Sequence, residues 1–127
     1  DKPLISIITP IFNNDKYLQE CLDSLHIQAY SNYEHIIIDG HSTDGTCNFI
    51  KNYDGHKIIF LDEEEKGIYQ AINQGIKEAN GKYIMLLNSD DWLNDSAMKI
   101  IAKKHVNFYF LNTYAYQKTC FFSDFFF

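Results

Sequence analysis

Short runs of apolar, mostly β-branched residues alternate with segments of helical character along most of this chain. The apolar runs have the length and composition of buried strands, and they cover residues 4–9, 35–38, 57–61 and 83–87. Cap residues and apolar spacings of three or four predict helices between them, at about 16–28, 42–50 and 68–79. Strands that alternate with helices form right-handed βαβ units around a parallel sheet. The sequence therefore predicts an α/β fold, a three-layer αβα sandwich built on a mainly parallel, Rossmann-like sheet.

Turn and cap residues are expected to set the ends of these elements. Pro10 is predicted to stop the first strand, and Asn13, Asn14 and Asp15 then offer turn chemistry and a cap for the following helix. Residues 42–44 offer caps for the short second helix. A further helix is predicted over 95–104.

One domain is expected from a length of 127 residues. We assign it to residues 1–106. Residues 107–127 are crowded with aromatic side chains and show no periodicity, so we interpret them as an atypical C-terminal tail rather than a separate domain. An exposed aromatic tail is a contact surface, and one hypothesis is that it joins two copies of the chain.

Charge and cysteine content narrow the classes of partner and compartment. The formal net charge of −6, without a basic patch, argues against a nucleic-acid partner. Three widely spaced cysteines without a CxxC pair indicate reduced thiols and a cytoplasmic location. No apolar run approaches the roughly 20 residues needed to cross a bilayer, and peripheral contact with the inner face of a membrane stays open.

Three segments with polar and aromatic side chains are predicted to meet at the C-terminal edge of the sheet, where open α/β sheets bind ligands. They are residues 9–13, Asp39 and residues 88–91. Phe12 offers a flat face to a planar base, Asp39 can accept a hydrogen bond from a base imide, and the Asp90-Asp91 pair can hold a cation on a diphosphate. Taken singly, Asp90-Asp91 also fits a solvated loop or a helix cap, and Phe12 fits a core residue.

At this point the chain resembles the inverting family 2 glycosyltransferases with the GT-A fold, of the bacterial polysaccharide-assembly type. The segments that carry the resemblance are ISIITPIFN (5–13), IIIDGHSTDGT (36–46), KGIYQAINQGI (66–76) and NGKYIMLLNSDD (80–91). Their order and spacing are far more specific than any one of them alone. The resemblance implies that residues 1–106 form the part that binds a nucleotide-diphosphate sugar, most simply a UDP-sugar.

The resemblance also implies roles for single residues. Thr9, Pro10 and Phe12 would line the pocket for the base and ribose, and Asp39 would hydrogen-bond the base. Asp90 would lie nearer the ribose, and Asp91 would bind the metal, Mg²⁺ or Mn²⁺. Two further nucleotide-binding positions are implied by the third segment: Lys66, beside a position where many members present a basic residue to the diphosphate, and Asn73, in the predicted third helix.

The resemblance implies sugar transfer to a glycan or lipid-linked acceptor. Loss of the sugar leaves negative charge on the diphosphate, and a cation held by Asp91 would stabilise it. Family members supply the catalytic base from residues after the metal motif, where this chain has only Asp95 and Asp124 in unfamiliar contexts, so no catalytic residue is assigned. The chain is interpreted as truncated after the metal motif.

Two other functions compete with this interpretation. The first is a catalytically inactive nucleotide-binding or oligomerisation module. The second is a sugar nucleotidyltransferase, which is disfavoured because no glycine-rich basic phosphate loop follows the first strand.

Overall fold

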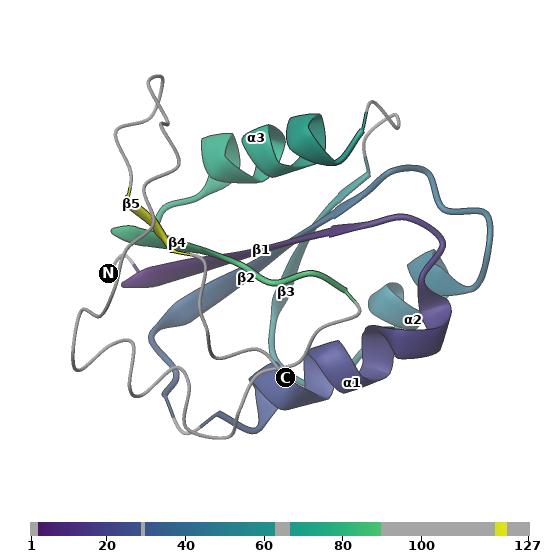
Figure 1. The fold of residues 1–127 in the computed structure, drawn as a ribbon. Coiled ribbons are helices and arrows are strands. Elements are labelled where there is room, and N and C mark those ends of the chain that lie inside the picture. Colours follow the sequence, from purple (N-terminus) through teal and green to yellow (C-terminus); the bar gives the residue numbers. More distant parts are fainter. Residues whose placement is uncertain (1–2, 29, 63–66, 90–118, 122–127) are drawn as a thin grey trace.

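A parallel sheet of five strands organises the described part of the protein (Figure 1). The computed structural model describes residues 3–28, 30–62, 67–89 and 119–121. The strands are β1 (Ile5–Ile11), β2 (Tyr33–Asp39), β3 (Ile58–Asp62), β4 (Tyr83–Leu86) and β5 (Thr119–Phe121). They lie in the order β3-β2-β1-β4-β5, and every pairing is parallel. The predicted α/β fold with a parallel sheet is confirmed.

Helices cover both faces of this sheet, as the three-layer prediction requires. They are α1 (Asp15–His26), α2 (Thr46–Lys51) and α3 (Ile68–Glu78). Figure 1 shows α1 and α2 on one side of the sheet and α3 on the other. Alternate strand residues face opposite layers. One face packs Ile7 and Ile37 against the α1 and α2 side, and the other packs Ile8 and Ile36 against Ile76 of α3.

The α3 helix approaches the sheet closely because it carries a glycine at the contact. A Cβ atom on Gly75 would lie 2.7 Å from Cγ2 of Ile8 and 2.8 Å from Cδ1 of Ile38. Both isoleucines are fully buried, so the space that a side chain would need is filled by the sheet. Gly75 therefore sets the distance between α3 and the two central strands β1 and β2.

The prediction that Pro10 stops the first strand is wrong, because β1 continues to Ile11 and pairs with β2 as far as Asp39. The reason is that Pro10 lacks a backbone N–H only on the side of β1 that faces β4. Leu87 N–H donates to the Ile8 carbonyl at 2.9 Å, so Ile8 faces β4, and residue 10 faces the same way. Proline has no N–H to donate. Pro10 therefore ends the β1–β4 ladder while β1 stays paired with β2.

Of the residues predicted to cap the helices, Asp44 caps α2, whereas Asn14 does not cap α1 through its side chain. Asn14 occupies the N-cap position of α1, but its side chain makes no cap hydrogen bond. The α2 helix begins at Thr46 rather than near residue 42, and Asp44 receives the Thr46 backbone N–H at 3.0 Å. A hydrogen bond from the Thr46 hydroxyl lowers the pKa of Asp44 below its ordinary value. Asp44 thus serves α2 as a cap from just outside the helix.

Beyond residue 89 the structure describes only the three residues of β5. This strand lies within the segment interpreted as an aromatic tail, and its backbone pairs in parallel with β4 from Thr119 to Phe121. The sequence pattern of this segment does not predict a strand. The helix predicted over 95–104 lies outside the described residues. None of the helices in the described part is long and apolar enough to cross a membrane.

Candidate functional site

The strand order creates a topological switch point between β1 and β4. The chain leaves β1 towards β2 on one side, and β4 returns to pair on the other side of β1. In open α/β sheets, ligands bind beside the carboxyl ends of the strands at such a point. The candidate site therefore lies at the ends of β1, β2 and β4. Figure 1 shows these ends at the edge of the sheet where α1 and α3 begin.

The three predicted site residues at the end of the first strand, Thr9, Pro10 and Phe12, occupy different environments. Phe12, directly after β1, is 50% exposed, so it is not a core residue. Pro10 is buried in β1. Thr9 is fully buried, and its hydroxyl Oγ1 lies 2.7 Å from Nε2 of His35. Of these side chains, only that of Phe12 is offered to a ligand at the surface, and the nucleotide contacts of all three stay predictions.

Asp39 ends β2, and its carboxylate is fully buried and tightly held. The Ser42 N–H donates to Oδ2 at 3.1 Å, and the Ser42 hydroxyl donates to Oδ1. The Cys47 thiol donates to Oδ2 at 2.8 Å. The loop from Gly40 to Gly45 thus folds back on the strand that precedes it. A carboxylate with three donors is oriented by its surroundings and retains capacity to accept one more hydrogen bond.

Cys47 acts at this site as a donor. The hydrogen bond to Asp39, followed by burial, raises the pKa of the Cys47 thiol to about 11. The thiol is therefore protonated at neutral pH, and it is the thiolate that acts as a nucleophile or a metal ligand. Cys47 is therefore a hydrogen-bond donor to Asp39 rather than an activated nucleophile.

Asn13 joins the loop after β1 to the loop after β2. Its backbone N–H donates to Ser42 Oγ at 2.9 Å, and its side-chain Oδ1 accepts the N–H of Thr43 at 2.8 Å. Its φ angle of 49° lies in the left-handed region, which asparagine tolerates better than most residues. Ser42 therefore links Asn13 to the Asp39 carboxylate. The two loops form one hydrogen-bonded unit.

Asn14 joins the same unit to the end of β4. Its side-chain Nδ2 donates to Ser89 Oγ at 2.5 Å, and its backbone N–H donates to Thr46 Oγ1 at 3.2 Å. Ser89 is buried, although it follows the last paired residue of β4. The ends of β1, β2 and β4, far apart in sequence, are thus brought together as predicted for a common edge.

Several predicted site residues lie elsewhere or outside the described part. Lys66, Asp90 and Asp91 are outside the described residues. Asn73 is exposed on α3. The described residues include no group of three or more histidine, cysteine or acidic side chains placed to hold a metal. The metal site predicted at Asp91 therefore stays a prediction.

A chain of hydrogen bonds, buried at Thr9 and His35 and half-buried at His56, runs from Thr9 to the connection between α2 and β3. His35 Nδ1 lies 2.9 Å from His56 Nε2, while its Nε2 faces Thr9. Burial, and then the neighbouring His56, lowers the pKa of His35 well below its usual range. Burial, and then His26, lowers the pKa of His56 to about 4. Both imidazoles are therefore neutral at pH 7 and act as structural hydrogen-bonding groups between the strands and the connection before β3.

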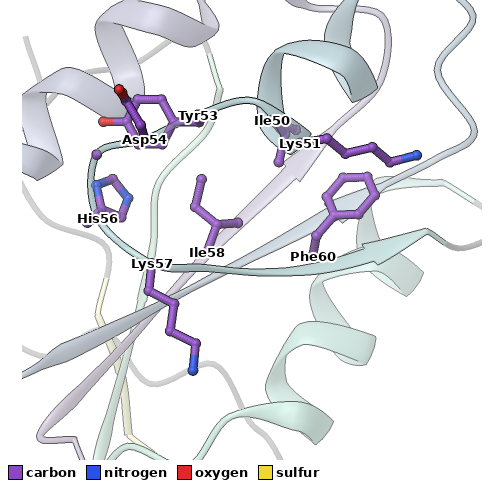
Figure 2. A pocket seen from close by; sticks show the side chains of 9 residues that line it. Ile50, Lys51, Tyr53, Asp54, His56, Lys57, Ile58 and Phe60 are labelled. Atoms are coloured by element: carbon purple, nitrogen blue, oxygen red, sulfur yellow. The ribbon is translucent and has the colours of Figure 1, made fainter.

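A cavity of about 410 Å³ lies beside this histidine chain, around the connection that leads into β3 (Figure 2). Its lining includes Ile50, Tyr53, His56 and Phe60. Figure 2 shows the Lys57 side chain directed away from Ile58 and His56. Because the sheet is parallel, this connection enters the N-terminal edge of the sheet, opposite Asp39 and Ser89. The cavity is separate from the candidate site.

The residues that sequence reasoning missed are the ones that bind the loops together. Asn13 and Asn14 were interpreted as turn or cap residues, and Ser42 as a possible cap. Their hydrogen-bond partners lie 29 to 75 residues away or, for Ser42 and Asp39, depend on the local turn, so composition carries no sign of them. One local signal was available, the two consecutive asparagines after a strand. Asparagine tolerates the left-handed backbone region, and its side-chain amide can hydrogen-bond to a neighbouring loop.

Comparison with known proteins identifies relatives of this chain. A family model described as "Glycosyl transferase family 2" matches residues 6–121. The chain is 32% identical over 106 residues to Glycosyltransferase GlyA of Streptococcus pneumoniae, which covers 82% of this chain and 15% of that protein. It is 36% identical over 103 residues to the putative teichuronic acid biosynthesis glycosyltransferase TuaG of Bacillus subtilis, covering 77% of this chain and 40% of TuaG. The chain thus spans less than half the length of these relatives.

Solved structures show the same architecture. The structure of S. aureus TarS 1-349 superposes with a TM-score of 0.73 at 27% identity, covering 80% of this chain and 33% of that one. The same protein in complex with UDP-GlcNAc matches with a TM-score of 0.68 at 29% identity, covering 80% of this chain and 32% of that one. The family match spans most of the chain and includes the ends of β1, β2 and β4. The chain belongs to glycosyl transferase family 2.

Proposed function

We propose that this protein binds a nucleotide-diphosphate sugar, a UDP-sugar, at the ends of β1, β2 and β4 and transfers the sugar to a glycan or lipid-linked acceptor. The observation that carries the proposal is the Asp39 carboxylate, buried at the end of β2 and oriented by Ser42 and Cys47. Membership of family 2 supports it, and so does the likeness to TarS, whose structure was solved with UDP-GlcNAc.

The base would be recognised by Asp39 and Phe12. A uracil imide N–H is a donor, and an oriented carboxylate is its matching acceptor. The exposed ring of Phe12, directly after β1, offers a face on which a planar base can stack. Pro10 and the backbone of Thr9 precede Phe12 at the same strand end. These residues would hold the nucleoside, while Lys66 and Asn73 would contribute to the remainder of the nucleotide.

Asp91 would bind Mg²⁺ or Mn²⁺, with Asp90 nearer the ribose. Carboxylate oxygens are the hard donors that these cations prefer. Ser89, which directly precedes the pair, is held at the same sheet edge as Asp39, so the donor set and its place in the chain fit a cation. When bound, the cation supplies Lewis-acid stabilisation of the departing diphosphate.

The acceptor half of the reaction is left without assigned residues. Inverting transfer needs a base that removes the proton of the acceptor hydroxyl, and no described residue is proposed for this role. We propose that the reaction takes place in the cytoplasm, with peripheral contact at the inner face of the membrane when the acceptor is lipid-linked.

Calorimetric titration with UDP, in Mn²⁺ and in EDTA, tests donor binding. We expect Mn²⁺ to strengthen binding by the wild-type protein and to have no effect on Asp91→Ala. Asp54→Ala is the matched control, because Asp54 is an exposed carboxylate on the connection before β3, away from the site. Absence of UDP binding, or a Mn²⁺ effect that persists in Asp91→Ala, contradicts the proposal.

A further inference from the structure

Asn88 and Ser89, which follow β4 and Leu87, are held by side chains rather than by the sheet. The last β1–β4 backbone hydrogen bond runs from Leu87 N–H to the Ile8 carbonyl. The next donor on that edge of β1 would belong to Pro10, which has none. Asn88 and Ser89 therefore lie beyond the ladder with β1. Contacts other than the β1–β4 ladder must therefore fix the position of Asn88 and Ser89.

Side chains of Asn14 and Cys21 hold Asn88 and Ser89 in place. Asn14 Nδ2 donates to Ser89 Oγ at 2.5 Å, and the Cys21 thiol donates to the Asn88 carbonyl oxygen, with Sγ 3.7 Å away. The Asn14 bond is the shorter of the two and joins strong hydrogen-bonding groups, whereas a thiol is a weak donor. The position of Ser89 is therefore set mainly by Asn14.

A role in capping does not explain Asn14. It stands at the N-cap of α1, where an asparagine side chain commonly accepts a backbone N–H of the first turn, yet it makes no such bond. Its amide is directed instead to a residue 75 positions away in the sequence. Its own backbone N–H donates to Thr46, at the start of α2. Asn14 therefore gives up a local role to connect the loop after β1 with both neighbouring strand ends.

We propose that Asn14 and Ser89 form a positioning pair that sets the place of the two carboxylates following Ser89 in the sequence, Asp90 and Asp91. This inference rests on the proposed metal role of Asp91. Consecutive Cα atoms are about 3.8 Å apart, so movement of Ser89 passes directly to Asp90. Metal–ligand distances tolerate about 0.2 Å. Loss of the Asn14–Ser89 hydrogen bond therefore weakens the metal-dependent part of nucleotide binding and spares the part that depends on Asp39.

The test is UDP affinity measured by calorimetry in Mn²⁺ and in EDTA for Asn14→Ala, Ser89→Ala and the double variant. We expect each single variant to lower the ratio of the two affinities by about tenfold, the lower end of the loss caused by changing residues that support metal ligands. The affinity ratio of the double variant should fall no further than that of either single variant, because both substitutions remove the same hydrogen bond. Affinity in EDTA should stay within about twofold of wild type in all three.

Asn52→Ala is the matched control, since it removes an asparagine whose amide donates at the far end of α2, to the Asn48 carbonyl at 2.9 Å. It should leave the affinity ratio unchanged. Thermal melting of every variant separates a positioning effect from loss of fold, which lowers affinity with and without metal alike. An unchanged ratio in Asn14→Ala and Ser89→Ala, or an equal loss in EDTA, overturns the pair while the proposed function stands. A wild-type protein whose UDP affinity ignores Mn²⁺ overturns both.

Discussion

The Cys47 thiol donates a hydrogen bond to the Asp39 carboxylate at 2.8 Å, across the loop that joins β2 to α2. Ser42 donates to the same carboxylate from within the loop, and Asn13 donates to Ser42 from the loop after β1. A single buried acid therefore anchors two loops of the candidate site. Because Ser42 and Cys47 already donate three hydrogen bonds to this carboxylate, it can accept about one more. Its proposed contribution to base selection can therefore be measured by substitution.

Asp39→Asn is expected to change the base that the protein prefers. An aspartate accepts the N3–H of uracil, whereas an asparagine amide can donate to the unprotonated N3 of cytosine. The ratio of UDP to CDP affinity should fall by about tenfold or more, since an unpaired buried polar group costs about 1–3 kcal/mol. Calorimetry with both nucleotides measures the ratio. A general loss of folding weakens the binding of both nucleotides equally and leaves the ratio unchanged. An unchanged ratio in a variant that is still folded therefore contradicts the role of Asp39 in base recognition.

The Cys47 thiol should be slow to react with alkylating reagents. With a pKa of about 11 it is protonated at pH 8, and the thiolate is the reactive form. Asp39→Asn removes the charge that raises this pKa, so alkylation of Cys47 should become several-fold faster. Mass spectrometry after timed iodoacetamide labelling locates the modification and gives its rate. Equal rates in the two proteins would show that the carboxylate does not control the thiol.

Stability is expected to fall in mild acid because of His56. Its pKa is about 4 in the folded protein and near 6.5 when unfolded. Between these values the unfolded chain binds more protons, so the free energy of unfolding is fully present above about pH 6.5 and declines as the pH falls towards about 4. His35, whose pKa is also lowered, acts in the same direction.

Urea unfolding at a series of pH values checks this decline. His56→Gln should make the stability less dependent on pH in that window, because the substituted side chain does not take up a proton. His41→Gln is the control, since His41 lies at the other edge of the sheet and is largely exposed, where its Nδ1 is 3.1 Å from Asp62. A wild-type stability that is constant down to about pH 5 contradicts the prediction.

Gly75→Ala should destabilise the fold, although alanine is the better helix former by about 0.5–1 kcal/mol. The added Cβ meets Ile8 and Ile38, which are buried and cannot withdraw without disturbing the sheet. We expect a loss of about 1–3 kcal/mol, measured by urea unfolding. Gln70→Ala, at an exposed position of the same helix, reports the propensity gain alone and should leave stability equal or slightly higher. A stabilised Gly75→Ala would mean that α3 shifts freely on the sheet.

Local sequence was sufficient for β1 to β4, the three described helices and their layers, but not for β5. A sheet buried on both faces consists of short β-branched runs, and each helix that covers it has one apolar side. It was insufficient where the outcome depends on a distant partner. The effect of Pro10 depends on where β4 ends, and the roles of Asn13 and Asn14 depend on loops 29 and 75 residues away. Asp39 and Phe12 were placed at the correct sheet edge because a strand end is visible in the sequence, whereas the donors that hold Asp39 were not.

The strand order has a consequence for how the protein is made. The central strand β1 is synthesised first, yet its second neighbour, β4, follows nearly 80 residues later, as the pairing of Ile5 with Tyr83 shows. Pairings between segments so far apart in sequence form slowly, and an unpaired strand edge is a template for association with other chains. During translation β1 keeps one edge open until β4 leaves the ribosome. Nascent chains that stall before residue 83 are therefore the species most exposed to aggregation and most in need of a chaperone.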